Sequence, residues 1–294
     1  SKGENVGESW EISAVEGSES VVADGEEAGM PIGMLVDRYR GHLVGKAVYE
    51  KYGNEFPLLV KFIDARLDLS IQVHPDDELS QLRHGKRGKT EMWYVIDNHG
   101  GSHLVSGIKR KISPAEYARA VEDHTIAGLL CDYEVHPGDV FFLPAGRIHS
   151  IGAGTFLAEI QETSDITYRI YDFNRRDSSG KLRELHTELA ADAIDYTVQP
   201  DYRTDYERLQ DVLTPIADCR HFSVRLLDLT RRHEIDMSDT DKFVVVMVVD
   251  GNVSVAADDD KRDCRRGETI LVAAAASKLV IDTESQAKVL LATV

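Results

Sequence analysis

The stretch GDVFFLPAGRIH, from Gly138 to His149, combines an apolar segment, a sharp turn and a histidine. Val140 to Leu143 are apolar and favour a β-strand, whereas Pro144 and Gly146 are residues that interrupt strands and form turns. The histidine follows the turn directly, at the start of the next segment. The sequence therefore predicts a strand, a tight turn and a candidate ligand in close succession.

Two further strand-like stretches carry polar side chains among apolar ones. In LSIQVHP, from Leu69 to Pro75, polar and apolar residues alternate. Because a strand sends every second side chain to the same face, Gln72 and His74 are expected to point the same way. The stretch KTEMWYVI, from Lys89 to Ile96, also favours a strand and contains Glu91.

Together these stretches supply two imidazoles, one carboxylate and one amide. A lone histidine on an apolar strand is usually a core residue, and a lone glutamate on a strand is usually solvated. As a set, these nitrogen and oxygen donors suit a divalent cation, zinc first, with water in an open position. Iron, manganese and cobalt accept the same donors, so the residues leave the metal open. The predicted ligands are Gln72, His74, Glu91 and His149.

The spacing of Gly138, Pro144, Gly146 and His149 resembles the second motif of the cupin family of small β-barrels. Ala153 stands where that motif usually ends in asparagine. The resemblance implies a mainly β fold of cupin, jelly-roll-like barrels.

The first cupin motif would have His-x-His followed by glutamate. Here it is Gln72-x-His74, with a longer insertion before Glu91. This departure resembles the metal site of the type I phosphomannose isomerases. That family also carries a run similar to GESWEIS at Gly7 to Ser13, preceded there by another segment, so we expect a shortened N-terminus.

Three more features are similar to that family. Lys89 lies two residues before Glu91, so on a strand it shares the face of the predicted ligand. The segment SDITYR, from Ser164 to Arg169, resembles the family's Ser-Asp-x-x-x-Arg segment, whose arginine and aspartate lie at the active site. The strand-like Glu159 to Glu162 precedes it, as in the family. The resemblance is good from Gly7 to Arg175 and looser beyond.

The resemblance implies an aldose–ketose isomerase that interconverts mannose 6-phosphate and fructose 6-phosphate through a cis-enediol(ate). It implies one zinc ion per chain, which orients the sugar oxygens at C1 and C2. Arg169 is the candidate for stabilising the enediolate, and Lys89 or Asp165 for moving the proton. The candidates for binding the phosphate are Lys86 and Arg87, with Lys89 also possible there.

Two barrels in tandem are expected, with a small helical insert at about 113–131. Ser113 can cap this helix, Pro114 suits its first position and Glu116 can complete a capping box. We expect a catalytic, metal-binding cupin domain over 1–215 and a degenerate, metal-free cupin-like β domain over 216–294. In the second domain, GETILV from Gly267 to Val272 echoes the first, but Ala273 to Ser277 follow it without a ligand.

Composition narrows the partners and the compartment. A net charge of −17 argues against binding to nucleic acid or anionic membranes, and no apolar run is long enough to cross a bilayer. No signal-like segment stands at the N-terminus. The three cysteines, Cys131, Cys219 and Cys264, form no C-x-x-C pair, which favours structural thiols in a reducing compartment. We therefore expect a cytoplasmic enzyme that acts on a small phosphosugar and is a monomer or a homodimer.

Two other functions are compatible with a cupin barrel. A non-catalytic sugar- or phosphosugar-binding cupin would not need Lys89, Asp165 and Arg169 together. A non-haem iron oxygenase would normally have more histidine ligands, and Gln72 in place of the first histidine argues against it.

Overall fold

A computed structural model describes residues 7–176 and 180–294. The fold is mainly β, as predicted, with four antiparallel sheets. Internal contacts divide the chain into two units. The first contains the residues up to Ser9 and Ile63–Thr204, and the second contains Trp10–Phe62 and Asp205–Val294. The boundary between 215 and 216 stays a prediction, as does the metal-free character of the C-terminal domain.

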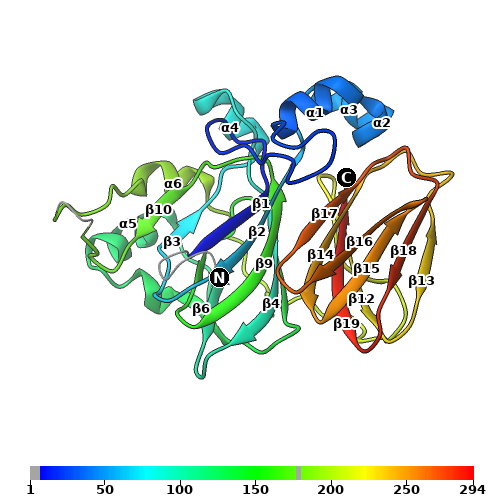
Figure 1. The fold of residues 1–294 in the computed structure, drawn as a ribbon. Coiled ribbons are helices and arrows are strands. Elements are labelled where there is room, and N and C mark those ends of the chain that lie inside the picture. Colours follow the sequence, from blue (N-terminus) through cyan, green and yellow to red (C-terminus); the bar gives the residue numbers. More distant parts are fainter. Residues whose placement is uncertain (1–6, 177–179) are drawn as a thin grey trace. The chain divides into compact units, whose positions relative to one another are not determined.

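Two sheets build the first unit (Figure 1). The division between the units falls inside β1 (Glu8–Ile12) and inside β2 (Leu58–Asp64). One sheet has three neighbouring strands in the order β9 (Thr155–Glu162), β4 (Glu91–Asn98), β7 (Val140–Leu143). The other has the order β10 (Tyr168–Tyr171), β3 (Ile71–Val73), β8 (His149–Ile151), β5 (His103–Ile108), β6 (Leu130–Glu134).

The strand that carries Gln72 is shorter than predicted. The alternation from Leu69 to Pro75 favours a strand, but only Ile71–Val73 has strand structure. Asp68 instead uses its carboxylate to accept a hydrogen bond from the Ala153 backbone N–H at 2.8 Å, so this end of the segment forms a loop contact.

Helices lie in the connections of the first unit. The predicted capping box is confirmed: α5 (Pro114–Glu122) begins after Ser113, with the reciprocal Ser113–Glu116 hydrogen bonds in place. A 3₁₀-helix (Ile126–Leu129) follows. Helix α4 (Asp77–His84) is capped by Asp76, whose side chain accepts from Leu79 N–H. Helix α6 (Thr187–Ala193) follows His186, which stands at its N-terminal cap position.

Helices α5 and α6 pack on one face of the β10-β3-β8-β5-β6 sheet. Ile71 and Val73 of β3 share a buried cluster with Tyr117 of α5 and Ala190 of α6. Because side chains alternate along a strand, Gln72 projects from the opposite face. The apolar contacts of the insert therefore fix the sheet whose other face carries the polar residues.

The second unit contains three short helices and two sheets. The helices are α1 (Ile32–Tyr39), α2 (Gly41–Val44) and α3 (Lys46–Tyr52). One sheet has the order β11 (Thr214–Asp218), β12 (Ser223–Leu229), β19 (Ala287–Thr293), β14 (Val244–Asp250), β17 (Thr269–Val272). The other has the order β13 (His233–Asp236), β18 (Lys278–Asp282), β15 (Asn252–Ala257), β16 (Asp260–Arg265). Among the described residues, each helix is too short or too polar to span a bilayer.

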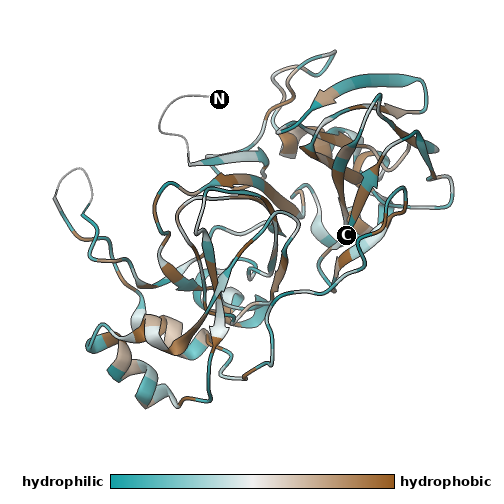
Figure 2. Ribbon diagram, turned by 90° about the horizontal axis from the view of Figure 1, so that it is seen from below, coloured by the Kyte–Doolittle hydropathy of each residue, from teal (hydrophilic) through white to brown (hydrophobic). Residues whose placement is uncertain are grey.

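The strand orders of the two units repeat one pattern. The neighbours β9-β4-β7 in the first unit correspond to β19-β14-β17 in the second, and β3-β8-β5-β6 correspond to β13-β18-β15-β16. The two similar sequences found above become β7 and β17, which occupy matching places at the end of a sheet. In both units hydrophobic residues are concentrated on the strands, while many connecting loops are hydrophilic (Figure 2). The similarity between the two sequence segments therefore reflects a structural repeat.

Candidate metal centre and active site

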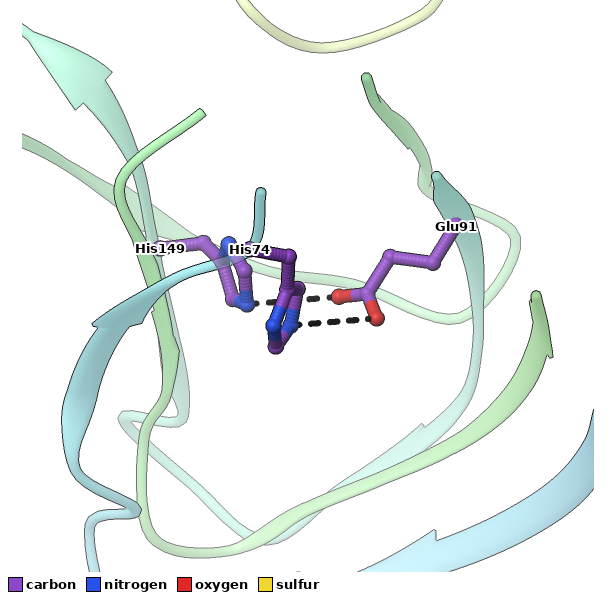
Figure 3. Close-up of side chains that lie close together, drawn as sticks. All are labelled: His74, Glu91 and His149. Carbon is purple, nitrogen blue, oxygen red and sulfur yellow. Dashed lines mark ion pairs between the residues drawn. The ribbon is translucent and has the colours of Figure 1, made fainter. Parts of the chain in front are cut away.

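Three of the predicted ligands meet inside the first unit. His74 follows the end of β3, Glu91 begins β4 and His149 begins β8. One ligand atom from each lies within 4.8 Å of the others, and all three side chains are buried. Both imidazoles face the carboxylate (Figure 3): His149 Nε2 lies 3.3 Å from Glu91 Oε1, and His74 Nε2 lies 3.5 Å from Glu91 Oε2.

Main-chain carbonyls orient both imidazoles. His74 Nδ1 lies 2.9 Å from the Ile166 carbonyl oxygen, and His149 Nδ1 lies 2.8 Å from the Arg147 carbonyl oxygen. Because a carbonyl can only accept, each Nδ1 carries a hydrogen, and in the neutral form of such a ring the lone pair is at Nε2. Burial, opposed by the hydrogen bond to Arg147, lowers the pKa of His149 to about 3, so this imidazole is neutral at physiological pH.

The fourth predicted ligand lies beside the other three. Gln72 is the cross-strand partner of His149, and its amide nitrogen is 3.2 Å from His149 Nε2. Its amide oxygen lies 3.4 Å from Ser70 Oγ. The oxygen is the metal-binding atom of an amide, and rotation of the amide plane by half a turn exchanges it with the nitrogen.

This donor set fits a divalent cation. Two ligands about 2.1 Å from one ion in tetrahedral geometry are separated by roughly 3.4 Å. The gaps of 3.3 and 3.5 Å between Glu91 and the imidazoles match that separation. Neutral imidazoles, a carboxylate and an amide are also the ligand types that zinc and similar ions accept.

Lys89 lies in the same buried cluster. Its ammonium nitrogen is 2.9 Å from Glu91 Oε2 and 3.1 Å from His74 Nε2. Burial lowers the pKa of Lys89, but attraction by Glu91 and then Glu159 outweighs it, and the net pKa is raised. The lysine is therefore a cation held against the carboxylate of the site.

Glu159 is a further residue of this cluster that the sequence reasoning did not select. It lies on β9 opposite Trp93 of β4, is 3% exposed, and accepts a 2.9 Å hydrogen bond from Trp93 Nε1. The indole ring packs edge-on against His149, with ring centroids 5.3 Å apart. The alternation Glu159-x-Gln161 was the available signal, because it places two polar side chains on one face of a strand.

Arg169 lies at the edge of the ligand-bearing sheet. It is the cross-strand partner of Gln72, so the two side chains project from the same face. Its Nη1 donates to the Glu184 carbonyl oxygen at 3.0 Å. Burial and, to a smaller extent, the nearby Arg183 lower the pKa of Arg169.

The remaining predicted residues lie outside the buried cluster. Asp165 and Lys86 form an ion pair of 3.3 Å, and both side chains are about half exposed, at 46% and 54%. Arg87 lies in the segment between α4 and β4, and its carbonyl oxygen accepts hydrogen bonds from Ser80 Oγ and Ser164 Oγ. These residues therefore lie on a more exposed part of the first unit than Lys89.

The chain is similar to known mannose-6-phosphate isomerases. A model of the catalytic domain of type I phosphomannose isomerase matches residues 1–106. Mannose-6-phosphate isomerase ManA of Bacillus subtilis is 34% identical over 92% of this chain and 84% of its own length. The Streptococcus mutans enzyme of the same name is 32% identical over 92% of this chain and 83% of its own.

The fold is also similar to that of a mannose 6-phosphate isomerase. The crystal structure of the Bacillus subtilis mannose 6-phosphate isomerase superposes with a TM-score of 0.87 at 29% identity, covering 100% of this chain and 91% of that one. Together with the candidate metal-ligand cluster, the sequence and fold similarities lead to one conclusion. This chain belongs to the type I phosphomannose isomerase family.

Proposed function

We propose that this chain interconverts mannose 6-phosphate and fructose 6-phosphate. The observation that carries the proposal is the buried cluster of His74, Glu91, His149 and Lys89 in a chain similar along 92% of its length to a protein named for that reaction. A plain sugar-binding barrel does not need a buried lysine beside a metal site.

One Zn²⁺ per chain is the proposed cofactor, with Gln72, His74, Glu91 and His149 as its ligands. The bound ion would act as a Lewis acid toward the sugar oxygens at C1 and C2. Two of the four ligands are already oriented by main-chain carbonyls, at Ile166 for His74 and at Arg147 for His149. The protein thereby presents donor atoms without having to reorient either ring.

Different side chains would transfer the proton and stabilise the negative charge of the enediolate. A base removes the C2 proton of the aldose and returns it to C1, while the hydroxyl proton at C2 passes to the oxygen at C1. We assign the base to Asp165, or to Lys89 if the charge of the bound metal ion lowers the pKa of its ammonium group. Arg169 is assigned to the negative charge of the enediolate, because a planar, permanently charged guanidinium can donate to two oxygens at once. Its place opposite Gln72 supports this assignment.

Lys86 and Arg87 are the proposed phosphate contacts. They follow α4 in a segment of partly exposed cations, and Lys86 reaches Asp165 at 3.3 Å. A phosphate bound by these residues would compete with the Asp165 carboxylate for the Lys86 ammonium group, and that competition would release Asp165 as the sugar binds.

For the cell, we propose the cytoplasm as the compartment and a monomer or homodimer as the assembly. The three cysteines are all free thiols, which supports a reducing environment.

A coupled assay that follows fructose 6-phosphate formed from mannose 6-phosphate tests the function. The expected result is turnover that a chelator abolishes and that Zn²⁺ restores. Glucose 6-phosphate serves as the control substrate. A fully metal-loaded protein that binds mannose 6-phosphate without converting it would contradict the isomerase and favour the sugar-binding alternative.

A further inference from the structure

Gln161 lies on the ligand-bearing face of the β9-β4-β7 sheet. It is the direct cross-strand partner of Glu91 in the antiparallel pair of β9 and β4. Side chains directly opposite one another share a face, with Cβ atoms about 4.5–5.5 Å apart. Gln161 is fully buried, at 0% exposure. Its side chain therefore begins beside that of Glu91, on the face of the sheet that carries the candidate metal centre.

The orientation of this amide is fixed by its nitrogen. Gln161 Nε2 donates to the carbonyl oxygens of Glu162 and Ser164, both at 2.8 Å. The reversed orientation would set the amide oxygen against those two carbonyl oxygens, where no hydrogen bond can form. The position of the amide oxygen, Gln161 Oε1, is therefore fixed as well.

That oxygen is left without a donor. Gln161 Oε1 is inaccessible and accepts no hydrogen bond from any residue in 7–176 or 180–294. Buried polar atoms in folded proteins are almost always hydrogen-bonded, because leaving one unsatisfied costs stability. An acceptor of this kind beside a ligand site is suited to an O–H group of the ligand.

We propose that Gln161 Oε1 accepts a hydrogen bond from the C3 or C4 hydroxyl of the sugar phosphate, which makes Gln161 a substrate-binding and specificity-determining residue. This inference rests on the proposed function. In the proposed function, the metal ion and Arg169 interact with the oxygens at C1 and C2. The C3 and C4 hydroxyls are the next ones along the carbon chain and have no assigned partner. An amide oxygen also rejects a substrate that lacks the hydroxyl, since the buried acceptor then stays unpaired.

The amide nitrogen of Gln161 also has a structural role. The experiment must distinguish this role from substrate binding by the amide oxygen. Through Glu162 and Ser164 the nitrogen holds the turn before Ile166, whose carbonyl orients His74. A substitution at Gln161 could therefore lower activity by displacing His74. Such a displacement would weaken every substrate alike, whereas a lost hydroxyl contact would matter only for substrates that have the hydroxyl.

The test is a double-mutant cycle between protein and substrate. kcat/KM is measured for mannose 6-phosphate and its 3-deoxy and 4-deoxy analogues with the wild type and with Gln161→Met, which keeps the length and removes the acceptor. In the wild type one analogue should be poorer than the parent by about tenfold. In Gln161→Met that penalty should fall to within about twofold.

Thr155→Val is the matched control. Thr155 is buried on the same strand, and its hydroxyl also lacks a partner among the described residues, but it pairs with Asn98 at the far end of β9 from Glu91. It should keep the wild-type penalty. Metal content is measured for each variant and should stay at the wild-type level.

Two results would overturn the inference. One is a wild type that uses both analogues as well as the parent, which needs no variant to fold. The other is a Gln161→Met protein that loses activity equally on all three substrates. If the wild type binds the sugars without turnover, the isomerase proposal fails alone, and the same cycle on dissociation constants measured by calorimetry still decides on Gln161. If it binds none of them, both fail.

Discussion

His149 is held at both ring nitrogens, and each contact has a different consequence. Nδ1 is fixed by the Arg147 carbonyl, and Nε2 faces Glu91 Oε1 at 3.3 Å. Burial keeps the ring neutral, with a pKa of about 3, so its lone pair is available for a metal across the physiological range. This environment suits the proposed metal ligand better than a group that transfers protons.

His149→Ala is expected to lose both bound metal and isomerase activity, because the variant removes one donor and leaves Glu91 without its facing imidazole. Metal content by mass spectrometry and turnover in the coupled assay check this. His136→Ala, at a histidine whose side chain is 64% exposed, is the control and should change neither. A His149→Ala protein that keeps stoichiometric metal would contradict the ligand assignment.

Arg169→Ala should lower kcat by about 10²–10³ while metal content stays normal, since a lost donor to a developing oxyanion typically costs that much. The comparison with Arg231→Ala, at an arginine whose side chain is 76% exposed, controls for loss of charge. Equal activity of Arg169→Ala and wild type would remove Arg169 from the reaction. A loss of metal in Arg169→Ala would instead indicate a role in holding Gln72.

The sequence supplied the four candidate ligands through their types and spacing, and the family resemblance added Lys89, Asp165 and Arg169. Glu159 was beyond that reasoning. A glutamate on an alternating strand is usually solvated, and only the register of β9 against β4 places it opposite Trp93 and out of solvent. Strand register depends on contacts between segments that are distant in the sequence, so the local sequence pattern does not reveal it.

At the scale of elements, strands with strong apolar patterns were predictable and others were not. β7 and β17 were both predicted, together with their relation as repeats. β16 (Asp260–Arg265) was missed because five of its six residues are exposed and polar, and its strand structure comes from pairing with β15. β8 was missed because it has only three residues, too few to show a period.

Gly107→Ala in β5 should destabilise the first unit by about 1–3 kcal/mol, the usual range for forcing extra volume into a packed core. Gly107 has φ +76°, and an added Cβ would lie 2.2 Å from the Tyr202 ring, which is buried. The midpoint of urea unfolding measures the loss. Gly128→Ala is the control, because a Cβ there meets nothing within 4 Å. Equal midpoints for the two variants would show that the Tyr202 ring moves aside at little cost.

At the scale of the whole molecule, the proposed ion would join segments far apart in the sequence. Its proposed ligands lie in or directly after β3, in β4 and in β8, and span residues 72 to 149. An ion that binds the folded chain stabilises it by mass action. Chelation should therefore lower the melting temperature by several degrees, and Zn²⁺ should restore it. Mg²⁺, which prefers oxygen ligands, should restore it less. A melting temperature that chelation leaves unchanged would contradict a resident ion.

The division of the chain into units has a consequence for biosynthesis. Nearly all of the first unit is the continuous segment Ile63–Thr204, whereas the second is assembled from Trp10–Phe62 and Asp205–Val294. A ribosome therefore releases the segment with all four candidate metal ligands while the second unit still lacks its C-terminal portion. Residues 10–62 leave the exit tunnel early but must wait for the last strands to be translated. Because domains generally fold as units during synthesis, we expect folding to begin with the segment Ile63–Thr204.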